Sequence, residues 1–208
     1  MRSLLAEAKN SLRECVVTNE SFNKATNDRR TAFKDLKTLS TQIVNALAVS
    51  GASELTINNA KTINRKLHGT RASAVNSKPT PATGLEAPMP TNKNISSSQQ
   101  SFDSMIEHFS KLIENVSQDA NYEPNEVELK TETLKADLAL LNNTNSALLT
   151  GYTNWSNARI IRNNTLYGPL TGMVQTALDV RKYVKSVYNA SSPQFNQLNG
   201  LEFKTRKD

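Results

Sequence analysis

Two long stretches of the chain carry apolar residues alternately three and four positions apart, the spacing that places side chains on one face of an α helix. The first stretch runs from Leu5 to Leu47, with no Pro or Gly before Gly51. It is apolar at both ends and polar around Arg29 in its middle. We expect one unbroken helix that ends at Gly51. Because its apolar face is narrow, this helix needs partner helices to be stable.

Shorter helices are expected on either side of a Pro-rich stretch. Residues 54–68 have helical spacing and are followed by Gly69, a residue type that commonly ends helices. Residues 70–95 hold Pro among many Ser, Thr and Asn residues, which predicts a linker or surface loop. The Ser-x-x-Gln pattern from Ser96 to Gln99 predicts the cap of a helix that extends to Val116.

The second long pattern of helical spacing runs from Leu134 to Leu166. Asn125, with Glu128 three positions later, is predicted to cap the helix that contains this pattern. Gly168 and Pro169 are expected to interrupt it, because Pro removes a backbone donor and clashes with the preceding turn. Helical spacing then resumes and is expected to end near Asn189.

The fold class predicted from these patterns is all-α. We expect an elongated antiparallel helical bundle with coiled-coil-like seams, a long Pro/Ser/Asn-rich linker and a short C-terminal tail. Residues 1–69 are predicted to form a long and a short helix, and residues 70–95 a flexible linker or loop. Residues 96–189 are predicted to form a helical hairpin with a long second helix, and residues 190–208 a tail that docks on the bundle. One domain would hold all of them.

Composition and charge refine this picture. Asn, Ser, Thr and Gln make up 71 of the 208 residues, which suits thin helices with narrow cores. The net charge of +6 divides into +5 over residues 1–69, −6 over 103–137 and +4 over 159–185. A uniformly basic nucleic-acid binder would not carry the acidic segment. Two explanations stay open: the acidic segment packs against the basic first helix of the same molecule, or it meets the basic end of another subunit.

The sequence offers little for catalysis or metal binding. The single Cys15 excludes an internal disulfide, and its place on the helical pattern is typical of a small buried apolar residue. His68 and His108 lack a second His or Cys at ligand spacing. No Gly-rich phosphate loop, nucleophile elbow or pair of catalytic carboxylates is found. We therefore expect a non-enzymatic protein with no catalytic residues, no metal and no cofactor.

One group of residues has a pattern that suits binding. Trp155, Arg159 and Arg162 lie four and three positions apart, so they are predicted to share one helix face. An aromatic ring beside Arg can bind phosphate or stack on a base. In the alternative, which we favour, these arginines and Arg29 form a polar layer inside the bundle, paired with carboxylates and stacked on aromatic rings.

Short pieces of the chain from Ser96 to the tail carry a resemblance to known sequences. The pieces are Ser96–Phe102, Tyr122–Lys130, Ala158–Arg159, Arg162–Asn163, Leu166–Tyr167, Tyr183–Ser186 and Ser192–Phe195, with weaker ones at Asn64–Lys66 and Gly69–Arg71. In these pieces the chain resembles a group of uncharacterised helical proteins of Bacteroidota. The resemblance covers about half of the chain and implies a bacterial origin. The group has no known activity, so the resemblance implies no substrate, cofactor or site residue.

The function predicted from these patterns is that of a helical structural or assembly protein, which acts through self-association or a partner helix. The alternative is a helical protein that binds nucleic acid or another anionic ligand. A membrane-active protein is a distant third possibility, because no stretch approaches the roughly 18 apolar residues of a spanning helix. The N-terminus lacks the apolar core of a secretory signal, which favours the cytoplasm if Met1 is the natural start.

Overall fold

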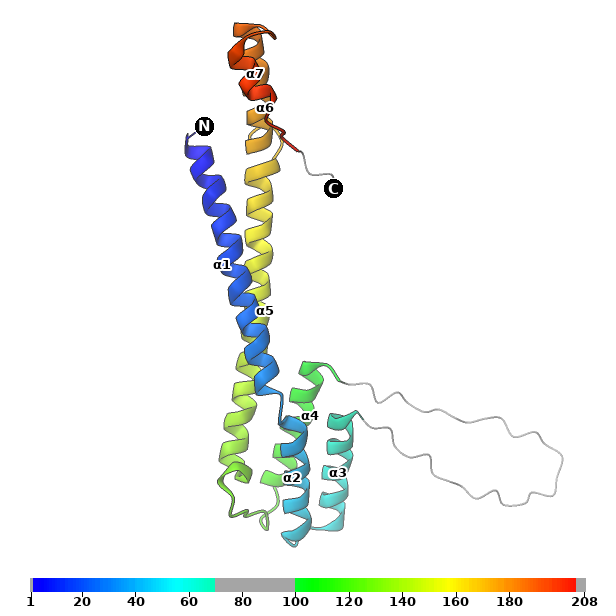
Figure 1. Cartoon of the computed structure of the whole chain (residues 1–208). Coiled ribbons are helices and arrows are strands. Elements are labelled where there is room, and N and C mark those ends of the chain that lie inside the picture. Colours follow the sequence, from blue (N-terminus) through cyan, green and yellow to red (C-terminus); the bar gives the residue numbers. More distant parts are fainter. Residues whose placement is uncertain (1, 70–99, 205–208) are drawn as a thin grey trace, which may run out of the picture. The chain divides into compact units, whose positions relative to one another are not determined.

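The chain is helical through the residues that the structure describes. The computed structural model describes residues 2–69 and 100–204, which hold α helices, one short 3₁₀ helix and no strand (Figure 1). The helices are α1 (Arg2–Ala32), α2 (Leu36–Val49), α3 (Glu54–His68), α4 (Phe102–Ser117), α5 (Thr131–Tyr167), α6 (Met173–Tyr188) and α7 (Pro193–Asn199), and the 3₁₀ helix is η1 (Val127–Leu129). The predicted all-α class is confirmed. The predicted linker at 70–95 and the predicted cap at Ser96 lie outside the described residues.

The helices divide into two compact units. Unit 1 comprises Met1–Asp28 and Ser146–Asp208, and unit 2 comprises Arg29–Asn145. Both α1 and α5 contribute to each unit.

Unit 2 surrounds a continuous apolar core. Its helix α3 packs against α2 and α4, and the first turns of α5 add Leu134 and Leu141. The buried apolar residues of this core are Phe33, Leu36, Ile43, Val44, Leu47, Ala60, Leu67, Phe109, Leu112, Ile113, Val116, Tyr122, Leu134 and Leu141. Ser53 and Ser101 cap α3 and α4 through their hydroxyls, and Gly69 ends α3 at φ +73°.

The first predicted helix is two helices in the structure. Helix α1 ends at Ala32 and α2 begins at Leu36, whereas one unbroken helix to Gly51 was expected. Phe33 and Leu36 are both buried in the unit 2 core, and the Phe33 ring meets the edge of Phe102 at 4.8 Å between centroids. Asp35, a residue type that favours helix starts, occupies the N-cap of α2. Burial of these side chains sets the break, and no Pro or Gly marks it.

The start of α5 also differs from the prediction. Asn125 was expected to cap this helix, but α5 begins at Thr131. Residues 127–129 instead form the 3₁₀ helix η1, and Lys130 has extended backbone angles. The buried Tyr122 explains this conformation. Its hydroxyl donates to the carbonyl of Leu129 at 3.0 Å, so the two ends of the segment from Tyr122 to Leu129 are held together.

Unit 1 consists of the first 28 residues of the chain, the second half of α5, and α6 and α7. The predicted interruption at Gly168 and Pro169 is confirmed, because α5 ends at Tyr167 and α6 begins at Met173. Helix α6 ends at Tyr188, beside the predicted Asn189. Helix α7 packs against α6 and is capped by the Ser192 hydroxyl, which accepts from the backbone N–H of Phe195.

Candidate functional site

Arg29 forms a small polar cluster in unit 2. Its Nη1 donates to Asn145 Oδ1 at 3.1 Å, and Asn145 Nδ2 donates to Asp103 Oδ1 at 2.7 Å. The guanidinium carbon lies 3.9 Å from the centroid of the Phe102 ring, and Nε is buried without a hydrogen-bond partner among the described residues. The amide of Asn145 thus stands between the cation and the carboxylate. This arrangement joins α1, α4 and α5 inside unit 2 and resembles a structural polar contact more than a ligand site.

Trp155 and Arg159 lie in unit 1, beside an aromatic cluster that joins two helices. The Phe22 ring stacks on Trp155 with 5.5 Å between centroids and an angle of 6°, and Tyr152 contacts both rings. The guanidinium carbon of Arg159 lies 4.8 Å from the Trp155 centroid. Gly151 permits this close approach, because a Cβ there would lie 3.3 Å from the Phe22 Cα.

Arg159 and Arg162 line an open groove in unit 1. The groove has a volume of about 420 Å³, and Leu12, Leu166 and Tyr167 are among its other walls. Arg162 donates from Nε and Nη2 to the Asn163 side-chain oxygen, at 3.2 and 2.8 Å. Among the described residues no carboxylate lies within ion-pair distance of either arginine. The groove therefore offers two cations and the Tyr167 ring to solvent.

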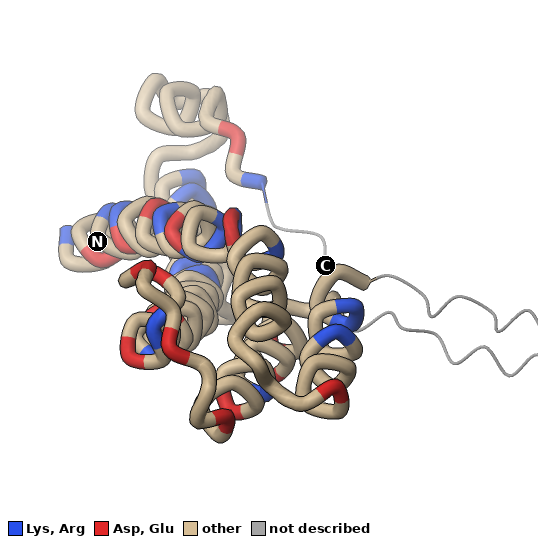
Figure 2. Tube along the Cα trace, turned by 90° about the horizontal axis from the view of Figure 1, so that it is seen from below, with Lys and Arg blue, Asp and Glu red and all other residues tan. Residues whose placement is uncertain are grey.

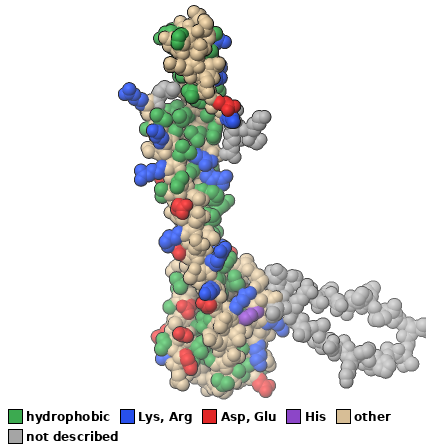
Figure 3. Space-filling model, viewed as in Figure 1, with side chains coloured by type: hydrophobic (Ala, Val, Ile, Leu, Met, Phe, Trp, Pro, Cys, Tyr) green, Lys and Arg blue, Asp and Glu red, His purple; other side chains and the backbone are tan. Residues whose placement is uncertain are grey.

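The structure also shows an apolar face on unit 1 that we had not predicted. On α1 its members are Leu5, Leu12 and Val16, and on α5 they are Leu149, Tyr152, Ile160 and Tyr167, each between 41% and 63% exposed. Hydrophobic side chains are visible along these two helices at the surface in Figure 3. A mostly apolar groove of about 220 Å³, lined by Arg2, Leu4, Leu5, Met173 and Ala177, continues the face toward α6.

A signal for this face is present in the sequence. The α5 residues Leu149, Tyr152, Ser156, Ile160, Asn163 and Tyr167 follow one another at steps of three and four, beside the pattern that packs against α1. The polar Ser156 and Asn163 interrupt it, so a search for one dominant apolar pattern passes over it.

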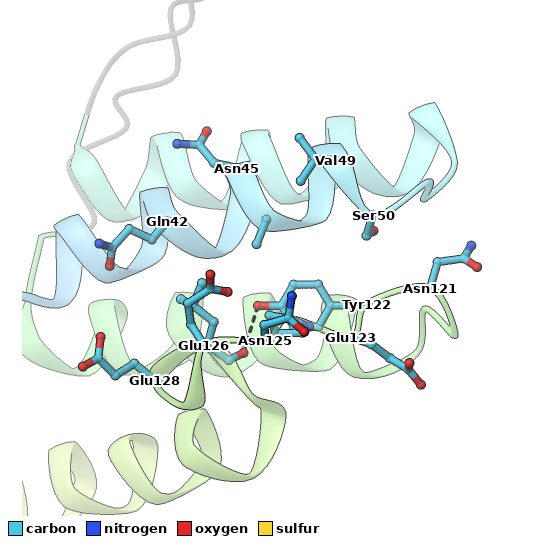
Figure 4. Close-up of a pocket in the computed structure, with 13 residues that line it drawn as sticks. Gln42, Asn45, Val49, Ser50, Asn121, Tyr122, Glu123, Asn125, Glu126 and Glu128 are labelled. Carbon is cyan, nitrogen blue, oxygen red and sulfur yellow. Dashed lines mark hydrogen bonds between the residues drawn. The ribbon is translucent and has the colours of Figure 1, made fainter.

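Unit 2 carries the largest groove described, with a volume of about 800 Å³. Figure 4 shows Gln42, Asn45 and Val49 from α2 on one side of it, and Tyr122 with three glutamates from the segment between α4 and α5 on the other. Those glutamates are Glu123, Glu126 and Glu128, so the groove attracts cations. Burial, with a smaller effect from Glu126, raises the pKa of Tyr122 to about 12, so its hydroxyl stays protonated in its bond to Leu129.

The remaining reactive side chains are buried or isolated. Cys15 is buried on α1, in agreement with its expected packing role. His108 is buried in unit 2, and its Nε2 has no hydrogen-bond partner within the described part of the chain. Across residues 2–69 and 100–204, no three His, Cys, Asp or Glu side chains are grouped so as to hold a metal ion.

The search for membrane-spanning helices and the comparisons with known proteins identify no protein class for this chain. None of the described helices combines the length and the apolar character that crossing a bilayer requires. No protein-family model, no curated protein and no solved structure matches the chain. The geometry of the two units is therefore the basis for a function.

Proposed function

We propose that this chain is a non-enzymatic helical assembly protein, whose unit 1 binds further helices side by side. The observation that supports this proposal is the imbalance within unit 1. Its buried apolar residues are small apart from Leu148, namely Ala8, Cys15 and Ala158 in the described part, while several of its large apolar residues, among them Leu12, Val16 and Ile160, are about half exposed. A pair of long helices with so narrow a core gains its stability from further packing.

The contacts within unit 1 support an antiparallel, coiled-coil-like pairing. Phe22 contacts Trp155, Leu12 shares a groove with Tyr167, and Leu5 shares a groove with Met173. Residue numbers therefore fall along α1 as they rise along α5 and α6, as antiparallel neighbours require. The buried side of α1 carries Ala8, Ser11 and Cys15, spaced three and four apart. Such small side chains let the two backbones approach closely, but they bury little apolar area.

The exposed face has enough apolar surface to drive association. Complete burial of a Leu, Val or Ile side chain contributes roughly 1.5–3 kcal/mol relative to full exposure. Val16 is 63% exposed and Ile160 is 56% exposed, so each gains about half or more of that amount when another helix covers it. A row of several such residues forms a continuous exposed apolar patch, and patches of this kind mark interaction sites on soluble proteins.

Sedimentation equilibrium of the full chain tests this proposal. We expect reversible association at micromolar concentration, and at least a tenfold rise in the dissociation constant for the double variant Leu12→Gln, Ile160→Gln. The matched control is Val49→Gln, Leu55→Gln, which changes two more exposed apolar residues of unit 2 and should leave association unchanged. Circular dichroism confirms that each variant keeps its helix content. A chain that stays monomeric at several hundred micromolar, with the double variant indistinguishable from it, would contradict the proposal.

A second candidate function is binding of an anionic ligand or a nucleic acid. The open groove supports it, because Arg159 and Arg162 line that groove without a carboxylate partner among the described residues and Arg159 stacks on Trp155. Trp155 is the single Trp of the chain and contacts Arg159 of the groove, so its fluorescence reports on binding near that arginine. Titration with single-stranded DNA should quench this fluorescence at low salt and lose the effect as salt rises.

The variant pair for this test separates the groove from general charge. Arg159→Ala, Arg162→Ala should abolish the quenching, while Arg181→Ala, Lys182→Ala removes the same charge from α6 and should reduce it slightly. Equal losses in both variants would show that the groove has no special part in binding.

A further inference from the structure

The two apolar stripes of unit 1 open toward the same side of the α1–α5 pair. Leu12 from α1 and Tyr167 from α5 line one groove. The other members of each stripe follow from these two at helical spacing: Leu5 and Val16 on α1, and Ile160 on α5. Apart from Arg159 and Arg162, which line the same groove, this flank of the two-helix pair is apolar along both helices. A second two-helix pair covers such a flank in a four-helix arrangement.

The first part of the α5 stripe, before Arg159 and Arg162, is free of charge. No Asp, Glu, Lys or Arg occurs from Leu138 to Ala158, although the face carries Leu149 and Tyr152 there. Burial of this stretch therefore costs no charge desolvation, and protein interfaces are depleted of charged residues in just this way. The α5 stripe therefore favours the binding of another helix, but it does not determine whether that helix runs parallel or antiparallel.

The α1 half does select a direction. Arg2, Lys9, Arg13 and Glu20 are exposed and follow one another at steps of seven, four and seven, beside the stripe of Leu5, Leu12 and Val16. Basic residues occupy the start of this edge and Glu20 its end. Figure 2 shows both signs along α1, near the end marked N. Charges at such edge positions set the partner and the orientation in helical assemblies.

A second copy of α1 in the antiparallel direction satisfies both patterns at once. The register that places Leu12 against Val16 of the other copy also brings Lys9 to within one residue of Glu20 of that copy. By symmetry the pair occurs twice in each dimer. A parallel copy would instead bring Arg2, Lys9 and Arg13 of both chains together. The Leu12–Val16 contact and the Lys9–Glu20 contact thus agree on one register, in which Leu5 lies opposite Asn23 of the other copy.

From this agreement we infer that the apolar face of unit 1 binds the same face of a second copy of this chain, antiparallel and related by a two-fold axis. This inference rests on the proposed assembly function and adds the identity and direction of the partner.

Charge reversal tests the inference directly. Lys9→Glu leaves two acidic residues and Glu20→Lys two basic residues at the proposed contacts, so each single variant should self-associate about tenfold more weakly. An equimolar mixture of the two should form a heterodimer with affinity near that of the unchanged chain, because the carboxylate introduced at position 9 of one copy then faces the ammonium introduced at position 20 of the other. Both effects should shrink at 1 M salt. The matched control is Glu7→Lys, the same charge change on α1 outside this edge, and it should leave association unchanged.

The outcomes separate the inference from the proposed function. Heterodimers in the mixture, detected by sedimentation with one variant labelled, support the inference. If the unchanged chain associates and Leu12→Gln, Ile160→Gln abolishes association, but the mixture gives no heterodimer, the antiparallel second copy is wrong and the assembly function stands. If the unchanged chain is monomeric at several hundred micromolar, the inference is wrong as well.

Discussion

The two units of this protein bury their side chains very differently. The large side chains that are almost completely inaccessible lie in unit 2, among them Phe109, Ile43 and Leu112. In unit 1 the described buried apolar residues are Ala8, Cys15, Leu148 and Ala158. Helix α5 takes part in both units, so helix propensity alone does not account for the difference. What differs is the number of helices that surround each stretch.

This difference teaches where stability and where binding reside in a chain with few apolar residues. Unit 2 gathers short helices around one core that buries large apolar side chains. Unit 1 leaves its apolar surface on one flank, where another molecule can use it. The same all-α composition thus produces one part with a large apolar core and one part with a narrow core.

The largest expected effect comes from matched leucine truncations in the two units. Leu112→Ala removes a completely buried side chain from unit 2 and should lower the free energy of unfolding by about 2–5 kcal/mol. Leu12→Ala in unit 1 changes a side chain that is 46% exposed and should lower it by less than about 1 kcal/mol in dilute solution. Urea unfolding followed by circular dichroism measures both. Equal losses would remove the distinction between the units.

An intermediate effect is expected at the polar cluster of unit 2. Asn145→Ala removes the amide between Arg29 and Asp103, so we expect a loss of about 1–2 kcal/mol in the free energy of unfolding. Asn143→Ala is the matched control, since it replaces an exposed Asn of the same helix and should change stability by no more than about 0.5 kcal/mol. If the two variants are equally stable, the cluster contributes nothing beyond helix propensity.

The smallest effect is confined to a narrow pH range. Burial, reinforced by Lys66 and Lys111 and opposed by Glu107, lowers the pKa of His108 below its ordinary 6.5. Between the lowered pKa and 6.5 the folded chain binds fewer protons than the unfolded chain. The free energy of unfolding should therefore fall as the pH drops through 6.5, and level off below the lowered pKa.

The comparison for this prediction is His108→Gln, which removes the titrating group. Urea midpoints measured at a series of pH values should show a shallower fall for His108→Gln than for the unchanged chain. His68→Gln changes the other histidine, whose Nε2 lies 3.0 Å from the carbonyl oxygen of Lys37, and should keep the His108 contribution. The same pH dependence with and without His108 would contradict this assignment.

Local signals made much of the fold predictable. Gly51 and Gly69 have φ angles of +87° and +73°, which glycine adopts easily, and both follow helix ends where they were expected. Gly168 and Pro169 likewise mark the end of α5. The break between Ala32 and Leu36 was not predictable in this way, because it depends on the burial of Phe33 against a residue far along the chain. Non-local packing of this kind leaves no periodic signal.

In the candidate site, too, contacts within one helix were predictable and contacts between helices were not. Spacing placed Trp155 beside Arg159 on one helix face, and the structure shows them stacked. Spacing along one helix does not identify the residue on the next helix, so Phe22 as the partner of Trp155 was not foreseen. Arg29, which was expected in the same polar layer as Arg159 and Arg162, is described in unit 2 with Asn145.

Hydrogen exchange of the full chain at two concentrations tests most directly whether unit 1, unlike unit 2, is stabilised by association with another molecule. The account predicts that amides of α1 and of the second half of α5 exchange rapidly at low micromolar concentration and become protected at high concentration, because association covers their exposed flank. Amides of α2, α3 and α4 should be equally protected at both concentrations. Strong protection of α1 that does not depend on concentration would contradict the account.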